Sequence, residues 1–366
     1  MMSDKITIFH EYGEPSHYIG LARLTSNKEI IYREFSTLRL IHKALKKKNF
    51  QGLYKAIKDF LFFVLCFLFP IILKNKIIVI GIAPLDYRVM FFNRVLKYTH
   101  VIYHTSWTDW SGNFYPKKNN FFKNKIKNAW SFFFNFRVKH IAAVTDIVKD
   151  SISRNWGLPR EKITTVYHAF DGNVFNLNNA MPIEGRNGIT FVGRLVKNKG
   201  ISNLLEIAKN NPTQNFTIVG EGELADMIVN SKLSNISYAG YISSKNELAN
   251  IFKKNKYIFL PSIKNENWEE LFGMVLPEAM ACGCIPVCTD HSGPKIILGN
   301  TKLQGLIFKE NEFNEAVNSV LKMSNEDSVF LFEEAVKVSQ NFEAKIISER
   351  WKKILCDISR LPHEKF

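Results

Sequence analysis

Two glutamates in the C-terminal half of the sequence stand in a setting that could form a site. Glu270 and Glu278 lie in E-E-L-F-G-M-V-L-P-E-A-M-A-C-G-C-I-P-V, which runs from 269 to 287. Helix positions with this spacing point about 80° apart, so we expect Glu270 in a loop and Glu278 in the first turns of a helix. Backbone N–H groups at that helix end would favour a diphosphate, and the two carboxylates could bond hydroxyl groups. A solvated surface helix could carry the same glutamates for solubility alone.

Two cations and three Gly-containing turns precede these glutamates. The stretch F-V-G-R-L-V-K-N-K-G places Arg194 and Lys199 after an expected strand end at Gly193. Arginine offers a planar fork to phosphate oxygens, and lysine offers a point charge. Further turns follow two more expected strands, in I-V-G-E-G-E and Y-A-G-Y-I, and they contain Gly220, Gly222 and Tyr241. Glycines there suit a close approach to a nucleotide, although a tight turn alone would explain them equally well.

The cysteines do not indicate a metal site or a disulfide framework. There are five, Cys66, Cys282, Cys284, Cys288 and Cys356, and we expect them to be reduced. A zinc cluster of Cys282, Cys284, Cys288 and His291 is an alternative, but A-C-G-C-I-P-V-C is typical of small core residues around a turn. The sequence contains no D-x-D triad. We therefore expect no metal and no other cofactor.

Short apolar runs alternate with helical patterns through both halves of the chain. This alternation predicts an α/β fold with parallel sheets and sites at the carboxyl ends of the strands. The predicted strands are 6–10, 76–83, 100–104, 140–145, 189–192, 216–219, 236–238, 257–260 and 285–288.

The same pattern predicts two domains. The predicted boundaries are 1–175 for the first domain, 176–188 for a polar linker, 189–342 for the second domain and 343–366 for a C-terminal amphipathic helix that packs towards the first. On that helix, Ile346, Ile347, Trp351, Ile354 and Leu355 are expected to share a face.

The net charge of +15 is confined to the first half of the chain. Residues 1–180 hold 27 Lys and Arg against 12 Asp and Glu, whereas residues 181–366 hold 22 of each. The first half is therefore expected to meet an anionic partner, which could be a lipid surface, a phosphorylated substrate or nucleic acid.

Two stretches of the first half are candidates for membrane contact. Residues 60–73 are uninterruptedly apolar but too short to span a bilayer, and Pro70 would bend a helix there, so we expect a buried or an interfacial helix. Residues 110–145 contain no acidic residue and mix lysines with large aromatics, which favours the headgroup boundary of an anionic membrane. The alternative for 110–145 is a solvated basic helix with a core-facing aromatic stripe. Because no nucleic-acid module accompanies the charge, nucleic acid is not expected.

Taken in order, the motifs of residues 189–298 resemble the donor half of a retaining glycosyltransferase of the GT4 type, also called group 1. The matching residues are Gly193-Arg194 with Lys199-Gly200, Gly220-Glu221-Gly222, and Glu270 with Glu278-Ala279-Met280-Ala281. The resemblance implies the GT-B fold, in which two Rossmann-like domains face each other across a cleft.

The resemblance also implies roles for individual residues. Arg194 and Lys199 would hold the donor diphosphate, Glu270 would bond hydroxyls of the transferred sugar, and Glu278 would accept from the ribose. Backbone N–H groups would contact sugar and phosphate. The remaining donor-side residues implied are Gly193, Gly220, Gly222, Tyr241, Leu271, Phe272 and Gly273.

The acceptor side of the family is matched more loosely. His104, at a predicted strand end, is a candidate to reach the donor sugar, although a histidine there is commonly structural. Gly13, His17 and Asp109 are weaker candidates on the acceptor side. In V-Y-H-A-F-D-G-N-V-F the family's usual Asn-Gly is replaced by His168-Ala169, so no catalytic role is assigned there.

The expected function is transfer of one sugar from a nucleotide donor to a lipid-linked saccharide, in bacterial surface polysaccharide (O-antigen or capsule) assembly. The start of the chain lacks a signal-peptide pattern, so a peripheral position on the cytoplasmic face of the plasma membrane is expected. Two alternatives remain: a sugar-nucleotide epimerase of the same fold, and a basic membrane- or nucleic-acid-binding protein without catalysis.

Overall fold

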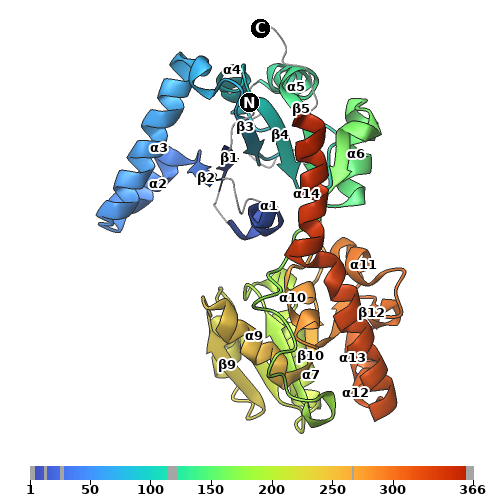
Figure 1. Cartoon of the computed structure of the whole chain (residues 1–366). Coiled ribbons are helices and arrows are strands. Elements are labelled where there is room, and N and C mark those ends of the chain that lie inside the picture. Colours follow the sequence, from blue (N-terminus) through green and yellow to red (C-terminus); the bar gives the residue numbers. More distant parts are fainter. Residues whose placement is uncertain (1–4, 12–14, 25–28, 114–121, 266–267, 360–366) are drawn as a thin grey trace. The chain divides into compact units, whose positions relative to one another are not determined.

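The computed structural model describes residues 5–11, 15–24, 29–113, 122–265 and 268–359, and it divides into two compact units (Figure 1). The first unit comprises Met1–His168 and Ile347–Phe366, and the second comprises Ala169–Ile346. In the described residues each unit contains one six-stranded sheet, and neighbouring strands of both sheets run parallel. The predicted α/β fold with parallel sheets is confirmed.

The first sheet has the strand order β2-β1-β3-β4-β5-β6. Its central strands are buried on both faces and read as continuous apolar runs, as helix-covered parallel sheets require. Their bounds are β1 Lys5–His10, β2 Glu29–Glu34, β3 Ile77–Ile80, β4 His100–Thr105, β5 Val138–Ala143 and β6 Ile163–Thr165.

The helices of the first unit surround this sheet. The ends of helix α6 are determined by its capping residues. The Thr145 hydroxyl accepts from the Val148 N–H at 3.3 Å, and Gly157 ends the helix with a φ of 62°. The helices are α1 Ile19–Leu24, α2 Thr37–Lys46, α3 Phe50–Leu68, α4 Val89–Val95, α5 Lys123–Phe132, α6 Asp146–Trp156 and α14 Ala344–Ser359, with shorter turns η1 Pro15–Tyr18, η2 Pro70–Leu73, η3 Phe133–Arg137 and η4 Arg160–Lys162.

The basic, aromatic stretch of residues 110–145 contributes much of its aromatic content to the core. Trp110, Trp130, Phe133 and Phe134 are all at most 1% exposed, and they surround Tyr103 with ring centroids 5.6–5.8 Å away. Phe122, Phe132 and Phe136 remain exposed on the same segment. The alternative of a core-facing aromatic stripe therefore describes a large part of this stretch. Lys117, Lys118 and Phe121 lie outside the described residues.

The apolar run of residues 60–73 is neither one helix nor fully buried. Helix α3 ends at Leu68, and Pro70 begins the 3₁₀ turn η2, because proline cannot continue the hydrogen-bonding ladder. In α3 the residues Ala56, Asp59, Phe63 and Cys66 are buried, whereas most of its other large apolar side chains are exposed. No helix in the described part of the chain combines the length and apolar character needed to cross a bilayer.

The second sheet has the strand order β12-β11-β10-β7-β8-β9. Strand β7 is the first strand of this sheet in the chain, and it has β8 on one side and β10 on the other. The order in which strands are added to the sheet therefore reverses between β7 and β10. The bounds are β7 Gly188–Val192, β8 Phe216–Val219, β9 Ile236–Gly240, β10 Asn255–Leu260, β11 Ile285–Thr289 and β12 Ile307–Phe308.

Helices cover the second sheet as well. They are α7 Ile201–Asn210, α8 Ala225–Asn230, α9 Lys245–Lys254, α10 Val275–Ala281, α11 Ser292–Leu298, α12 Phe313–Leu321 and α13 Asn325–Ser339, with shorter turns η5 Ile183–Gly185, η6 Lys197–Lys199, η7 Gln304–Leu306 and η8 Gln340–Phe342.

The unit boundaries differ from the predicted ones. The second unit begins at Ala169, before the predicted boundary at 175, and the predicted linker 176–188 packs within it. Arg186 is 3% exposed and donates to the carbonyls of Met181, Asn255 and Cys282.

The C-terminal helix α14 packs within the first unit from Ile347 onward. Its buried face is Ile347, Trp351, Ile354 and Ile358, whereas Ile346, which was expected on that face, is 47% exposed.

Candidate functional site

The candidate site lies at the carboxyl ends of β7 and β10, between which the strand order of the second sheet reverses. In open parallel sheets, ligands bind outside the strand ends at such a switch point. The loop after β7 carries Gly193, Arg194 and Lys199, and the loop after β10 carries Glu270. Tertiary structure thus brings together residues that are more than seventy positions apart.

An ion pair joins these two loops. The Lys199 ammonium group contacts Glu270 Oε2, and the Ser262 hydroxyl donates to the same oxygen at 3.4 Å. Glu270 is 9% exposed. The Lys199 Nζ also lies 5.1 Å from the centroid of the Trp268 ring. A cation and a carboxylate, both largely buried, are therefore held together at the switch point.

His291 and Gly293 hold the backbone N–H and carbonyl of Glu270. The Glu270 N–H donates to His291 Nδ1 at 3.2 Å, so in the neutral ring the proton is on Nε2, which donates to the Ser262 carbonyl at 2.9 Å. The Gly293 N–H donates to the Glu270 carbonyl at 2.8 Å. Sequence reasoning considered His291 only as a zinc ligand, and the structure gives it this bracing position instead.

The glycines of the site loops permit close contact between backbones. A Cβ on Gly220 would lie 1.8 Å from the Gly193 carbonyl oxygen, and a Cβ on Gly222 would lie 2.3 Å from that of Leu195. Gly200 is equally tight, with its Cβ position 1.8 Å from the Pro261 carbonyl oxygen. The glycine motifs are therefore explained by loop-to-loop packing, which shapes the floor of the site.

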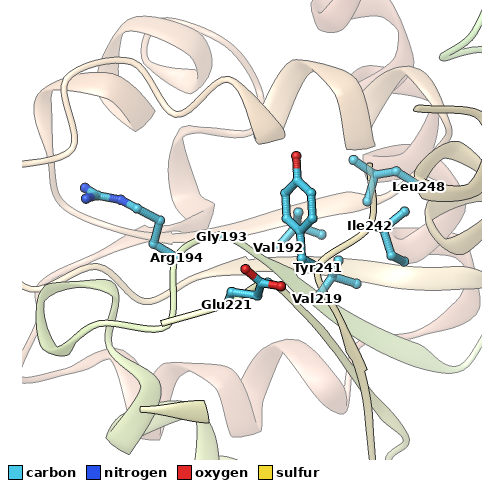
Figure 2. Close-up of a pocket in the computed structure, with 9 residues that line it drawn as sticks. Val192, Gly193, Arg194, Val219, Glu221, Tyr241, Ile242 and Leu248 are labelled. Atoms are coloured by element: carbon cyan, nitrogen blue, oxygen red, sulfur yellow. The ribbon is translucent and has the colours of Figure 1, made fainter. Parts of the chain in front are cut away.

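A pocket of about 420 Å³ opens at the ends of β7, β8 and β9 (Figure 2). Figure 2 shows the Arg194 side chain extending away from the Tyr241 ring. The sequence predicted Gly193, Arg194, Gly220 and Tyr241 as site residues, and all four line this pocket; its other lining residues are Val192, Val219, Glu221, Ile242 and Leu248.

Glu278 lies on α10 and is bound to a lysine that the sequence did not single out. Lys245 Nζ is 3.0 Å from Glu278 Oε1. Lys245 is the first residue of α9, the helix that also contributes Leu248 to the pocket. Glu278 is 6% exposed and Lys245 is largely exposed. Burial raises the pKa of Glu278, and Lys245 opposes that shift. In the sequence, Ser244 followed by Glu247 is a capping pattern that indicates the start of a helix, and this pattern could have drawn attention to Lys245.

The segment between the two glutamates forms as predicted, with Glu270 in a loop and Glu278 in the first helical turns. Gly273 has a φ of 70° and precedes Met274, the N-cap residue of α10. Phe272 is 5% exposed and packs edge-on against Phe342, with ring centroids 5.8 Å apart. Leu271, which lies between Glu270 and Phe272 in the chain, is partly exposed.

The remaining sequence candidates belong to the first unit. His104 is 6% exposed in a cluster with Tyr18, His168 and Trp351, at centroid distances of 5.0–5.9 Å. Burial lowers the pKa of His104 to about 3, with a further contribution from His17. His17 lies 4.4 Å from the His168 ring.

The last two acceptor-side candidates do not join this cluster. The exposed Asp109 accepts from the Ser111 N–H at 2.8 Å, as in a local turn. Gly13 lies outside the described residues.

The first unit has a pocket of its own, of about 480 Å³, at the ends of β1 and β2. One wall is polar: Glu11 accepts from Ser36 at 2.8 Å and from Arg88 at 2.6 Å. The pocket also has an apolar lining, which includes Leu38, Phe60, Phe63, Val64 and Phe91.

The cysteines of the second unit are core residues. Cys282, Cys284 and Cys288 are buried with at most 1% exposure, and burial raises the pKa of each thiol. Among the described residues, no group of three or more His, Cys, Asp or Glu side chains is arranged to hold a metal ion.

The fold and this site define an α/β protein of the GT-B type. The structure of Anabaena Alr3699/HepE in complex with UDP and glucose aligns with a TM-score of 0.67 at 14% identity, covering 96% of this chain and 99% of that one. A glycosyltransferase from Rickettsia africae ESF-5 aligns with a TM-score of 0.65 at 16% identity, covering 97% and 99%. The lipopolysaccharide outer core galactosyltransferase WaaB, in its apo form, aligns with a TM-score of 0.60 at 14% identity, covering 96% and 99%. The predicted GT-B fold is confirmed.

Residues 176–341, which make up most of the second unit, match the family model of group 1 glycosyl transferases. This match supports the resemblance drawn from the motifs and covers both the Lys199–Glu270 pair and Glu278. No curated protein matches the sequence.

Proposed function

We propose that this protein is a retaining glycosyltransferase that moves a sugar from a nucleoside diphosphate to a lipid-linked saccharide. The observation that carries the proposal is the Lys199–Glu270 pair at the switch point of a unit matching the group 1 family. A cation beside a carboxylate is what a nucleotide sugar requires, because the diphosphate is anionic and the sugar offers hydroxyl donors. No metal or cofactor is assigned to the reaction.

The donor would lie along the carboxyl edge of the second sheet. The pocket of Gly193, Tyr241 and Leu248 would take the base, and Glu278 would accept from the ribose in exchange for Lys245. Lys199 and the exposed Arg194 would hold the diphosphate. The structure of Anabaena HepE is a complex with UDP and glucose, so UDP is the first nucleotide to test.

In the proposed reaction, the bond between the anomeric carbon and the diphosphate oxygen breaks first. The acceptor hydroxyl attacks on the same face, and its proton passes to the departing phosphate oxygen. Lys199 and Arg194 stabilise the charge on the leaving group, and Glu270 positions the sugar through its hydroxyls. Rate enhancement then comes from positioning and electrostatics, without a protein nucleophile.

His104 has a limited role in this proposal. A pKa of about 3 keeps its imidazole neutral near pH 7, so it would accept or donate a hydrogen bond without supplying a charge.

The first-unit pocket supports an amphipathic acceptor. Its Glu11–Arg88–Ser36 wall suits saccharide hydroxyls, and its wall of Phe60, Val64 and Phe91 suits an apolar chain. A lipid-linked saccharide combines both. Together with the positive first half, this pocket supports our proposal that the enzyme acts peripherally on the cytoplasmic face of a bacterial plasma membrane, in O-antigen or capsule assembly.

The first test is isothermal calorimetry with UDP, GDP, ADP and CMP in the presence of EDTA. One diphosphate is expected to bind, and Arg194→Ala and Glu278→Ala are each expected to weaken it, whereas the exposed Lys197→Ala should leave it unchanged. Binding of none of the four would overturn the donor site. Donor consumption without any acceptor would point to an epimerase, and inversion at the anomeric carbon in the NMR spectrum of the product would contradict retention.

A further inference from the structure

The outward face of α3 carries a continuous line of exposed apolar side chains. Phe50, Tyr54, Ile57, Leu61, Leu65 and Leu68 follow the i, i+4, i+7, i+11, i+15, i+18 spacing of one helical face. Their exposed fractions range from 41% to 80%. The buried residues Ala56, Asp59, Phe63 and Cys66 occupy the opposite face. Helix α3 is thus apolar on two faces, and only one of them packs against its own unit.

The apolar area extends beyond α3. Phe69, Ile71 and Ile72 in and before η2 are 43–57% exposed, and Leu38 and Leu45 on α2 are 69% and 59% exposed. Helices α2 and α3 pack side by side at the edge of the first unit (Figure 1). We call this area the α2–α3 surface. Soluble proteins rarely leave so many large apolar side chains together in water, so the surface is expected to have a partner.

The charge around the α2–α3 surface has one sign. Residues 37–76 contain nine lysines and arginines and one acid, Asp59. Asp59 is 3% exposed and bound to Arg33 at 2.6 Å, so it does not neutralise the outer face. The basic residues lie on α2, in the turn after it and on the flank of α3: Arg39, Lys43, Lys46, Lys47, Lys48, Lys55 and Lys58.

This charge pattern selects among partners. A second copy of the chain would bring two basic surfaces together, which is unfavourable. An anionic bilayer offers phosphates to the lysines and an acyl boundary to the apolar face, as interfacial helices require. The α2–α3 surface meets these requirements better than residues 110–145, where Trp130, Phe133 and Phe134 are buried.

We propose that the α2–α3 surface docks the protein on an anionic lipid bilayer, with the exposed face of α3 at the headgroup–acyl boundary. The inference rests on the proposed function only in that the acceptor is taken to be membrane-borne. It identifies the face through which the first unit would meet the lipid that carries the acceptor, and it places Phe60 and Val64 of the first-unit pocket on the docking helix.

The test is flotation of the full chain with vesicles of phosphatidylcholine alone or with about one-third phosphatidylglycerol. The variant Leu61→Asp/Leu65→Asp is compared with Met227→Asp/Val229→Asp, which adds the same charge at exposed apolar positions of α8. Phe132→Asp/Phe136→Asp tests the other basic stretch. Circular dichroism confirms that each variant is folded, and calorimetry with UDP reports the donor site independently.

The wild type and both control pairs should bind phosphatidylglycerol vesicles with similar affinity, and the α3 variant should bind at least about tenfold less tightly. Lys46→Gln/Lys47→Gln/Lys48→Gln should weaken binding and reduce its dependence on salt. Undiminished binding by the α3 variant would overturn the proposal. So would a wild-type dimer that becomes monomeric in that variant without any vesicle binding, since the surface would then be a subunit interface. If the α3 variant no longer binds vesicles but still binds UDP, its defect lies in docking and not in the donor site.

Discussion

Lys199 and Glu270 reach each other from the loops that follow two adjacent strands, β7 and β10, and their side chains form a largely buried ion pair. The pair lies where the strand order of the second sheet reverses. Ser262 and His291 hold the carboxylate side of the pair through a hydroxyl and through the backbone. The positions of both charges are thus determined before any ligand arrives, which is the condition for electrostatic catalysis.

Glu270→Gln should separate catalysis from binding. The substitution keeps the size of the side chain and removes its charge, so UDP affinity should change by less than about threefold while kcat falls about 10²-fold or more. Lys199→Met should instead weaken UDP affinity by about tenfold or more, because a cation near the diphosphate is lost. Calorimetry and initial rates of sugar transfer measure both effects.

The control for this pair is Lys197→Met, on the same 3₁₀ turn but exposed. It should resemble wild type in both assays. Loss of UDP binding in Glu270→Gln, or normal turnover in it, would contradict the assigned roles.

Gly220→Ala should destabilise the second unit more than Gly240→Ala does. At Gly220 the new methyl group would lie 1.8 Å from the Gly193 carbonyl oxygen, and the φ of 144° is unfavourable for alanine. At Gly240 the φ is 66°, but no atom lies within 4 Å. We expect losses of about 2–4 kcal/mol and about 1 kcal/mol in unfolding free energy, respectively. Thermal unfolding with and without UDP measures this, and equal losses at both sites would show that loop packing does not require Gly220.

Glu278→Gln should stabilise the unliganded protein while weakening nucleotide binding. Burial raises the folded-state pKa of Glu278 above its ordinary value, so the wild type loses stability as the pH rises through that pKa. At pH 7.5 the neutral variant should therefore be more stable by about 1 kcal/mol. The difference should disappear as the pH falls towards 4.5, where the wild-type carboxyl becomes protonated.

Urea unfolding at several pH values and UDP titration together test this prediction. Lys245→Met is the informative partner variant: it removes the cation that lowers the Glu278 pKa, so it should enlarge the stabilisation obtained from Glu278→Gln. If the stability of Glu278→Gln relative to wild type were lower at pH 7.5 than at pH 4.5, the prediction would be wrong.

The first unit should lose stability in mild acid because of His104. Its folded-state pKa of about 3 lies below the ordinary value of 6.5, so its contribution is fully present above pH 6.5 and is lost progressively as the pH falls towards 3. At pH 5 the loss from this residue should be about 2 kcal/mol. Five of the six tryptophans belong to the first unit, so tryptophan fluorescence in urea reports its unfolding.

In His104→Gln the loss between pH 7.5 and pH 5 should be smaller than in wild type by about that amount. His42→Gln, at an exposed position on α2, is the control. Identical pH dependence in wild type and His104→Gln would show that the buried imidazole does not stay neutral.

The predicted strands are all present. Most of them are buried on both faces and so form continuous apolar runs that stand out in a sequence, whereas β9 is only partly buried. Strands β2, β6 and β12 were not predicted. Strand β2 is a partly exposed edge strand with Glu29, Arg33 and Glu34 among its residues, and the other two have three and two residues. Such segments take their strand conformation from a neighbour in the sheet, which their own composition does not record.

The outcome for the two membrane candidates shows the same limit. Residues 60–73 and 110–145 are both rich in phenylalanine, and composition alone favoured membrane contact for the second. Which apolar side chains enter the core depends on what packs against them. Trp130 and Phe134 meet Tyr103 of β4, whereas Leu61 and Leu65 of α3 remain 53% and 50% exposed. When a helix is apolar on two faces, the pattern of apolar residues in its sequence does not show which face is buried and which is exposed.

By itself the sequence determined the fold class, the order of the site motifs and the loop-and-helix placement of Glu270 and Glu278, because these depend on local periodicity and turn chemistry. Only the tertiary structure decided that Lys199 pairs with Glu270, that Lys245 pairs with Glu278, that His291 braces the site and that α3 leaves an apolar face outside. Those relationships join segments distant in the chain. They are determined by how the strands are ordered in a sheet and which helix faces are covered, and no short stretch of residues specifies either.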